Sequence, residues 1–205
     1  MYIACIPMFA KRIFDWIVLL AALPLALPLL LLVALVVRIG LGTPVLFRQQ
    51  RPGLHGRLFW LVKFRTMRNC ITGENMLATD GVRLGRLGAL LRKCSLDELP
   101  SFWNIAKGEM SWVGPRPLLP EYLSLYNARQ QKRHNVLPGL TGWAQIHGRN
   151  ALDWPARFEL DVWYVENRSL WLDMQILLKT VATVVGARQV SAPGQATVEP
   201  FRGNP

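Results

Sequence analysis

Hydrophobic residues are most concentrated in one stretch near the N-terminus. Residues 16–37 form a run of 22 residues without a charge, which Lys11 and Arg12 precede and Arg38 ends. A helix of this length is long enough to cross the hydrocarbon core of a bilayer, and it is too long for the core of a cleaved signal peptide. The pattern therefore predicts a membrane helix that remains part of the protein.

Prolines and flanking charges bear on how this helix enters the membrane. Pro24 and Pro28 lie one turn apart in its middle, where each removes a backbone donor and favours a kink. Cations dominate both flanks, and no acidic residue lies between Asp15 and Glu74, so the positive-inside rule assigns both flanks to the cytoplasm. A kinked span and a re-entrant helix that breaks near Pro28 both fit the prolines. Only the re-entrant helix also keeps both flanks on one face, and a buried core helix is a third alternative.

Shorter strand-like and helical patterns follow the membrane helix. Residues 45–47 and 58–62 are apolar runs on either side of a Pro-Gly turn and predict either two short strands or two segments that skim the membrane surface. Residues 82–93 repeat apolar positions at helical spacing with cations between them, which is typical of an amphipathic helix on a membrane surface. Further helices are expected at residues 96–106, 120–134, 154–165 and 170–185. The Pro- and Gly-rich residues 191–205 are expected to form a loosely held tail.

Composition narrows the class of protein. The chain has 205 residues, half of them apolar, yet it carries a net charge of +11. A basic balance of this size favours anionic lipid, phosphorylated ligands or nucleic acid, and eight Trp favour a membrane interface. Cys5, Cys70 and Cys94 are odd in number and widely spaced, which predicts reduced thiols rather than disulfides or a zinc site.

The adjacent carboxylates Asp97 and Glu98 have two interpretations. Ser95 and Glu98 have the spacing of a capping box, in which Glu98 would only hold the start of a helix. Alternatively, cations and a helix N-terminus would keep a carboxylate ionised, so that it binds a metal or acts as a nucleophile. Pro100 weakens the capping box, because it would fall at the fifth helical position. Both interpretations place the two carboxylates at a helix N-terminus.

Three other segments are candidates for phosphate binding. Residues 114–117 (Gly114-Pro115-Arg116-Pro117) predict a stiff turn that presents Arg116 to a phosphate or carboxylate, although a structural turn explains it equally well. Lys63 begins a segment of alternating cations and apolar residues, which suits either phosphate contacts or a strand lying on anionic lipid. The glycines of residues 138–145 would let the backbone approach a ligand closely, a weak signal by itself.

Several motifs occur in fixed order along nearly the whole chain. They are Lys11-Arg12-x-x-Asp15, Phe47-Arg48-Gln49-x-Arg51-Pro52-Gly53, Lys63-Phe64-Arg65-Thr66-Met67, Ser95-Leu96-Asp97-Glu98-Leu99, Met110-Ser111-Trp112-Val113-Gly114-Pro115-Arg116-Pro117 and Pro138-Gly139-Leu140-Thr141-Gly142-Trp143-Ala144-Gln145. In this order the sequence resembles the bacterial sugar transferases, the small monotopic phosphoglycosyl transferases.

The resemblance implies a reaction and a place in the cell. Such enzymes move a sugar-1-phosphate from a UDP-sugar to undecaprenyl phosphate, release UMP and use Mg²⁺. They act on the cytoplasmic face of the bacterial inner membrane, in contact with membrane lipids. The donor sugar that the resemblance implies is an N-acetylated amino sugar such as diacetylated bacillosamine. No motif in the sequence identifies the sugar or the oligomeric state.

The resemblance also implies a fold. It is an α+β fold, mostly helical, with a re-entrant, proline-broken membrane helix hairpin at residues 1–39. Interfacial amphipathic helices then hold a small cytosolic domain, residues 40–190, on the membrane, and the tail 191–205 follows. Pro28 matches the family's helix-breaking proline, and Pro24 adds a second break. The family often has Ser before this proline, whereas this chain has Leu27.

Site residues carry over one by one. Asp97 matches the nucleophile and metal ligand, and Glu98 its acidic neighbour. Arg92 matches a phosphate-binding cation, and Arg116 a residue close to the nucleotide. The remaining substrate-binding candidates are Lys63, Pro115, Pro117, Thr141 and Gln145.

Two alternatives come from other functional classes. Charge and aromatic content permit a membrane-anchored module that binds nucleic acid. Its cations would be expected to cluster, however, and here they are spread among apolar helices without a nucleic-acid-binding motif, so no nucleic-acid partner is expected. In a non-catalytic membrane scaffold, Asp97 and Glu98 would serve only as a helix cap.

Overall fold

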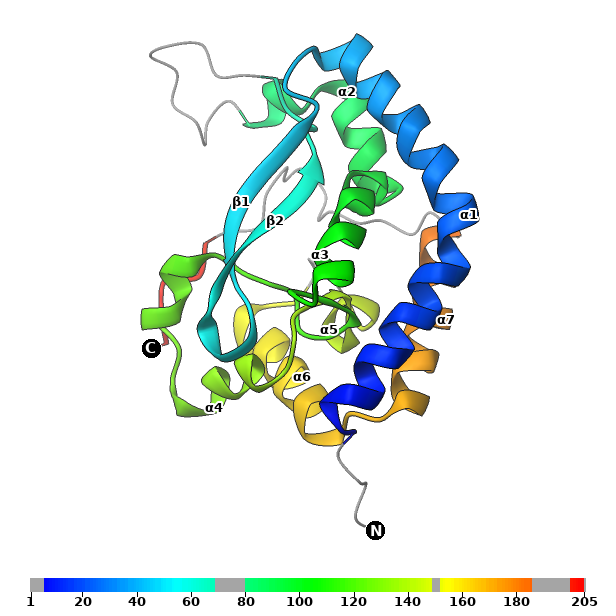
Figure 1. Ribbon diagram of the computed structural model, residues 1–205. Helices are drawn as coiled ribbons and strands as arrows, with labels where there is room; N and C mark the ends of the chain where they lie inside the picture. Colours follow the sequence, from blue (N-terminus) through cyan, green and yellow to red (C-terminus); the bar gives the residue numbers. More distant parts are fainter. Residues whose placement is uncertain (1–5, 69–79, 149–151, 186–199, 205) are drawn as a thin grey trace.

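The computed structural model describes residues 6–68, 80–148, 152–185 and 200–204 (Figure 1). Residues 191–199 of the expected tail lie outside these ranges. One long helix runs along one side of the molecule, and a two-stranded hairpin lies on the other side. Short helices fill the space between them, so the fold is mostly helical with a small α+β part.

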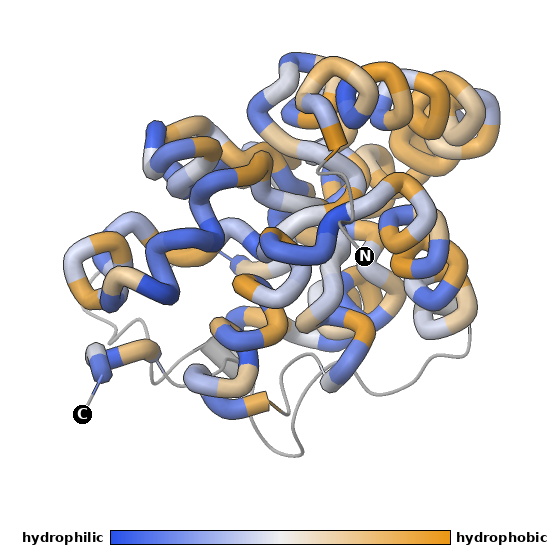
Figure 2. Tube along the Cα trace, turned by 90° about the horizontal axis from the view of Figure 1, so that it is seen from below, coloured by the Kyte–Doolittle hydropathy of each residue, from blue (hydrophilic) through white to orange (hydrophobic). Residues whose placement is uncertain are grey.

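Helix α1 (Met8–Leu41) bows along the body of the protein and contains Pro24 and Pro28. The chain stays helical through both prolines, and the re-entrant hairpin expected at residues 1–39 stays a prediction. Only 11% of its most hydrophobic stretch is buried, which does not fit a core helix of a soluble protein. Its length and composition are sufficient to cross a membrane. Figure 2 shows hydrophobic residues gathered along this helix at one edge of the molecule.

Both ends of α1 are fixed to the same globular body. Near its start, Lys11 Nζ lies 2.5 Å from Asp173 Oδ2, and Arg12 donates to the carbonyl of Ile105 at 2.9 Å. Near its end, Val33 and Val37 are buried in a hydrophobic cluster with residues of the hairpin and of the next helix. The middle of α1, by contrast, exposes leucine side chains along its length.

Strands β1 (Leu46–Pro52) and β2 (Leu58–Phe64) form an antiparallel hairpin, which confirms the two expected strands. A 3₁₀ turn, η1 (Leu54–Gly56), joins them. Asn104 fixes the hairpin to the interior, because its amide donates to the Trp60 carbonyl at 2.8 Å and accepts from the Val62 N–H at 3.1 Å.

Helix α2 (Asp80–Lys93) is kinked at Gly85 and leads to the carboxylate segment. Ser95 has a left-handed backbone with φ 56°, after which the chain forms the 3₁₀ helix η2 (Leu96–Ser101) and then α3 (Phe102–Lys107). The single helix expected at residues 96–106 is therefore divided. Pro100 explains the division, because it lacks the N–H that an α-helix interior requires.

A second sheet pairs β3 (Ser111–Val113) in parallel with β4 (Gly139–Thr141). A Cβ atom on Gly139 would lie only 2.1 Å from the Gly114 nitrogen, so glycine is required for the two segments to meet. The glycines of residues 138–145 were considered as a place where the backbone could approach a ligand. Some of these glycines instead allow two backbone segments to approach each other.

The remaining elements are short except for two helices near the C-terminus. The helix expected at residues 120–134 is three pieces, the 3₁₀ helices η3 (Pro120–Ser124) and η4 (Lys132–Asn135) with α4 (Ala128–Gln131) between them. Next come α5 (Trp143–Ile146), α6 (Trp154–Asn167) and α7 (Leu170–Val185). The helices α6 and α7 confirm the periodicity observed in the sequence.

The last described residues are held against the body. Phe201 is buried, and its backbone N–H donates to the Tyr122 hydroxyl at 3.1 Å. Asn204 donates to the Leu125 carbonyl at 3.0 Å and accepts a hydrogen bond from Gln130 at 2.6 Å. Residues 200–204 therefore correct the expectation of a loosely held C-terminal tail, because an aromatic ring at Phe201 anchors them.

Candidate active site

Asp97 and Glu98 occupy the first turn of η2, where the chain passes from α2 to α3. The hairpin holds this turn in place, since the buried Ser101 hydroxyl donates to the Val62 carbonyl at 2.8 Å. Ser95 makes no side-chain capping hydrogen bond, so the capping-box interpretation is wrong. The side chain of Glu98 has other hydrogen-bond partners.

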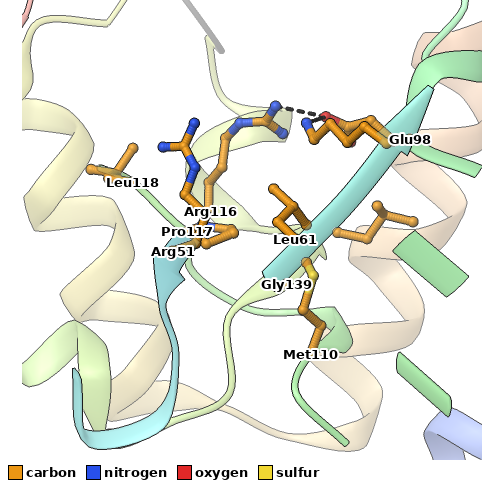
Figure 3. Close-up of a pocket in the computed structure, with 10 residues that line it drawn as sticks. Arg51, Leu61, Glu98, Met110, Arg116, Pro117, Leu118 and Gly139 are labelled. Carbon is orange, nitrogen blue, oxygen red and sulfur yellow. Dashed lines mark hydrogen bonds and ion pairs between the residues drawn. The ribbon is translucent and has the colours of Figure 1, made fainter. Parts of the chain in front are cut away.

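Glu98 joins two cations that come from distant parts of the chain. Its Oε1 atom accepts from Lys63 Nζ and from Arg116 Nη2, each at 2.6 Å (Figure 3). Burial alone would raise the pKa of Glu98, but Arg116 and Lys63 outweigh it and hold that pKa well below the usual range. Glu98 is therefore an ionised bridge between strand β2 and the turn at residues 114–117.

Asp97 is the carboxylate with fewer partners. Its side chain is buried, yet it accepts no hydrogen bond within the described part of the chain. Burial raises its pKa first, and the negative charge of Glu98 adds to the rise, whereas Lys63, Arg116 and Arg92 oppose it. The sequence argument that nearby cations keep this carboxylate ionised therefore fits Glu98 better than Asp97.

Arg92 and Arg51 complete the ring of cations. Arg92 lies at the end of α2, donates its Nε to the Thr66 hydroxyl at 3.1 Å and acts on the charge of Asp97. Arg51 was not among the candidate residues. Burial, and next the charge of Arg116, lower the pKa of Arg51 to about 10.

The position of Arg51 follows from strand pairing. Arg51 stands opposite Phe59 and Phe47 stands opposite Lys63 in the hairpin register. Directly opposite residues share a face, and alternate residues along a strand return to it, so Arg51 and Lys63 lie on the same face. Knowledge of the strand register would have identified Arg51 as a site residue. The apolar residues 45–47 alone did not define that register.

A pocket lies beside Glu98, and the neighbouring Asp97 is not part of its lining. Its lining includes three cations, one carboxylate and an apolar floor: Arg51, Leu61, Lys63, Glu98, Met110, Arg116, Pro117, Leu118, Gly139 and Leu140 (Figure 3). The cations exceed the acidic groups at its wall, so the pocket is suited to an anion such as a diphosphate.

The structure brings some of the predicted site residues to this pocket and leaves others outside it. Lys63, Glu98, Arg116 and Pro117 line it, and Pro115 lines a smaller adjoining cavity. Thr141 instead bonds to the Thr180 hydroxyl at 2.7 Å, and Gln145 has a buried amide with no hydrogen-bond partner among the described residues. Neither Thr141 nor Gln145 is part of the pocket lining.

A metal would have few protein ligands here. Within residues 6–68, 80–148, 152–185 and 200–204, no three His, Cys, Asp or Glu side chains gather as a metal cluster. Mg²⁺ usually binds one or two carboxylates together with water and substrate phosphates. Asp97 has the free oxygens for this arrangement, whereas Glu98 Oε1 is already engaged by two cations.

Comparisons with known proteins agree with these features. Residues 6–187 match the family described as bacterial sugar transferase. The chain is 48% identical over 197 residues to the uncharacterized sugar transferase EpsL of Bacillus subtilis, covering 96% of this chain and 98% of that protein.

Two larger relatives have names that state a reaction. The UDP-N-acetylgalactosamine-undecaprenyl-phosphate N-acetylgalactosaminephosphotransferase of Aeromonas hydrophila is 39% identical over 193 residues, 88% of this chain and 45% of that protein. The UDP-glucose:undecaprenyl-phosphate glucose-1-phosphate transferase of Xanthomonas campestris is 38% identical over 190 residues, 87% of this chain and 39% of that protein. The chain thus spans less than half the length of these two relatives. The chain belongs to the bacterial sugar transferase family.

Proposed function

We propose that this protein transfers a sugar-1-phosphate from a UDP-sugar to undecaprenyl phosphate and releases UMP. The observation that carries the proposal is a buried Asp97 that accepts no hydrogen bond from the described residues, directly followed by Glu98, which lines a pocket together with three cations. Family membership and the names of the two larger relatives support the same reaction.

The transfer proceeds in two steps at one phosphorus atom. In the first step a carboxylate oxygen of Asp97 attacks the phosphorus that bears the sugar, and the bond from that phosphorus to the UMP oxygen breaks. UMP leaves with the electron pair, and Asp97 carries an acyl-phosphosugar. In the second step a phosphate oxygen of undecaprenyl phosphate attacks the same phosphorus and releases the Asp97 carboxylate. Covalent catalysis of this kind divides one difficult transfer into two easier steps.

The surrounding cations bind and orient the phosphates. Lys63, Arg116 and Arg51 line the pocket, and the charge of Arg92 acts on Asp97. Positioning and charge stabilisation supply most of the catalysis in phosphoryl transfer, so these side chains carry much of the rate. Glu98 holds Lys63 and Arg116 at a fixed separation by accepting from both.

The site fits a Mg²⁺ ion that is coordinated by both the protein and the substrate. Asp97 would hold it, together with diphosphate oxygens and water, because its carboxylate has no competing donor in the described part of the chain. When bound, the ion neutralises the charge of the diphosphate. Chelation of the ion is expected to abolish UMP release and to weaken UDP binding measured by calorimetry. Unchanged UDP binding after chelation would argue against an ion that is coordinated by both the protein and the substrate.

The proposed location is the cytoplasmic face of the bacterial inner membrane, with α1 as a re-entrant, monotopic helix. Both ends of α1 are fixed to one globular body, through Lys11 and Arg12 at the start and Val33 and Val37 at the end. A helix that exported one end would have to break one of these attachments. Labelling of an N-terminal tag from the periplasmic side would contradict this topology.

The amphipathic helix α7 supports the same membrane contact. It exposes a hydrophobic stripe of Leu170, Trp171, Met174, Leu178 and Val181. These positions recur at helical spacing, so one face of the helix is suited to the bilayer interface. A site at the interface can receive both a water-soluble donor and a lipid acceptor.

The proposed donor carries an N-acetylated amino sugar, with UDP-diacetylbacillosamine as one member of the class. The Aeromonas relative is named for N-acetylgalactosamine, which belongs to this class, and the Xanthomonas relative is named for glucose. UMP release measured over a panel of UDP-sugars tests the choice. A clear preference for UDP-glucose or UDP-galactose would contradict the amino sugar and leave the reaction intact.

The experiment that tests the function is turnover by the purified full chain in detergent or nanodiscs. UMP is expected only when a UDP-sugar is supplied, and a lipid-linked phosphosugar is expected when undecaprenyl phosphate is added. An inactive parent protein across the whole panel would overturn the proposal.

A further inference from the structure

The C-terminal residues 200–204 contribute one side chain to an aromatic cluster on the body of the protein. The ring of Phe201 is 6% exposed and packs against four other rings at centroid distances between 5.0 and 6.1 Å. These rings belong to Tyr122, Tyr126, Trp154 and Phe158. We call these five residues the C-terminal aromatic cluster. Phe201 is the only member contributed by the end of the chain.

A buried arginine lies directly beside the cluster. Arg133 Nη1 donates to the Tyr126 hydroxyl at 3.1 Å, and its guanidinium lies 5.6 Å from the ring centres of both Tyr126 and Phe158. Its Nη2 donates to Asp161 Oδ2 at 2.7 Å, and both partners of this ion pair are about 98% buried. The aromatic cluster and Asp161 therefore hold this guanidinium together.

The same guanidinium reaches the candidate active site. Arg133 Nη2 also donates to the main-chain carbonyl of Arg116 at 2.8 Å, and Arg116 Nη2 in turn lies 2.6 Å from Glu98 Oε1. Proline on either side of Arg116 restricts the backbone at this point. A single hydrogen bond to this carbonyl thus helps to fix the position from which the Arg116 side chain enters the pocket.

The Arg133–Asp161 pair is poorly explained by stability alone. Removing two charges from water is costly, and well-packed apolar residues often replace a buried ion pair without loss. Here Arg133 of the pair also donates to the main-chain carbonyl of Arg116, in the turn that presents the Arg116 side chain. Its retention in the interior is consistent with a role in geometry.

We propose that Phe201 is a positioning residue for Arg116. By packing in the C-terminal aromatic cluster it holds Tyr126 and Arg133, and Arg133 holds the Arg116 carbonyl. This inference rests on the proposed phosphoglycosyl transfer, because that function gives Arg116 its role at the diphosphate. The C-terminal segment is then part of the donor-binding machinery, although it does not touch the pocket.

A double-mutant cycle in the full-length protein tests the connection. Phe201→Ala removes the anchoring ring, and Tyr126→Phe removes only the hydroxyl that accepts from Arg133, so it retains the aromatic packing. Each change is made in the parent and in an Arg116→Ala background. The dissociation constant for UDP and kcat/KM for the UDP-sugar are both measured, below the thermal transition of every variant. Arg202→Ala, an exposed neighbour on the same segment, is the control.

In the parent, Phe201→Ala and Tyr126→Phe are each expected to weaken UDP binding and lower kcat/KM by about five- to tenfold. In the Arg116→Ala background the same changes are expected to alter UDP binding by less than about twofold, because the residue they position is gone. Equal factors in both backgrounds, or no effect in the parent, would overturn the inference. UDP binding keeps the cycle measurable if no phosphosugar transfer is found, so failure of the proposed function is distinguishable.

Discussion

Two buried aspartates of this chain have contrasting surroundings. Asp173 receives a hydrogen bond on each carboxylate oxygen, from Lys11 at 2.5 Å and from the Tyr164 hydroxyl at 2.7 Å. Asp97 receives none from the described residues, and the charges of Lys63, Arg116 and Arg92 act on it. Burying a carboxylate costs free energy unless hydrogen-bond donors compensate for the lost water. A buried carboxylate without such donors therefore persists only because the surrounding structure holds it in place. The contrast distinguishes an aspartate that joins α1 to the body from one that is free to react.

Asp97→Asn is the largest expected effect on activity. The amide keeps the shape but loses the nucleophile, so UMP release should fall by about a thousandfold or more. The thermal midpoint at neutral pH should stay equal or rise, because the substitution removes a charge that burial and Glu98 disfavour more than the nearby cations favour it. UMP release and a thermal melt measure the two effects. Near-parent turnover would show that Asp97 is as structural as Asp173.

Asp173→Asn should produce the opposite outcome. Breaking the buried ion pair removes the nearer of the two carboxylates that Lys11 contacts and leaves Asp15 at 3.8 Å, so the free energy of unfolding should fall by up to about 3–5 kcal/mol. Activity per folded molecule should remain within about threefold of the parent, since catalysis does not use this carboxylate. Chemical denaturation and turnover at low temperature separate the two quantities. A large loss of turnover with unchanged stability would reverse the assignment of the two aspartates.

Arg51→Ala should affect donor binding more than chemistry. Loss of a charged hydrogen-bond donor from the pocket should raise KM for the UDP-sugar about tenfold. Arg48→Ala is the matched control, because Arg48 is exposed on the same strand and points to the other face of the hairpin. Equal KM values for the two variants would remove Arg51 from the site.

Glu98→Gln gives the subtlest effect, a shift in pH dependence. Asp97 must be ionised to attack, so kcat/KM should fall as pH decreases through its pKa, which burial and the charge of Glu98 raise. Removing the Glu98 charge lowers that pKa, so the acid limb should move to lower pH. Glu159→Gln, which changes an exposed carboxylate paired with Arg129, should leave the limb in place. A limb that moves to higher pH in Glu98→Gln would contradict the proposed coupling.

The sequence was sufficient for features that depend on local patterns. The uncharged run predicted α1, the apolar runs on either side of a Pro-Gly turn predicted the hairpin, and helical periodicity predicted α2, α6 and α7. Asp97 and Glu98 were found as a pair because two adjacent acids are rare in such a basic chain. Their chemistry was assigned through the resemblance to a family.

Features that depend on distant contacts could not be read from the sequence. The Ser95 to Glu98 spacing suggested a capping box, yet Glu98 turns to Lys63 and Arg116, which lie 35 and 18 residues away. Arg51 becomes a pocket residue only through the hairpin register, and Phe201 becomes anchored only because its ring packs against aromatic rings from distant parts of the chain. In these places tertiary contacts override the local pattern.

The measurement that tests the central claim most directly is the mass of the protein after incubation with a UDP-sugar alone. With undecaprenyl phosphate omitted, the peptide that contains Asp97 should gain the mass of one phosphosugar, and UMP should appear in equal amount. Adding undecaprenyl phosphate should remove the adduct, and Asp97→Asn should never form it. UMP release that requires both substrates together, with no adduct at Asp97, would contradict the covalent mechanism.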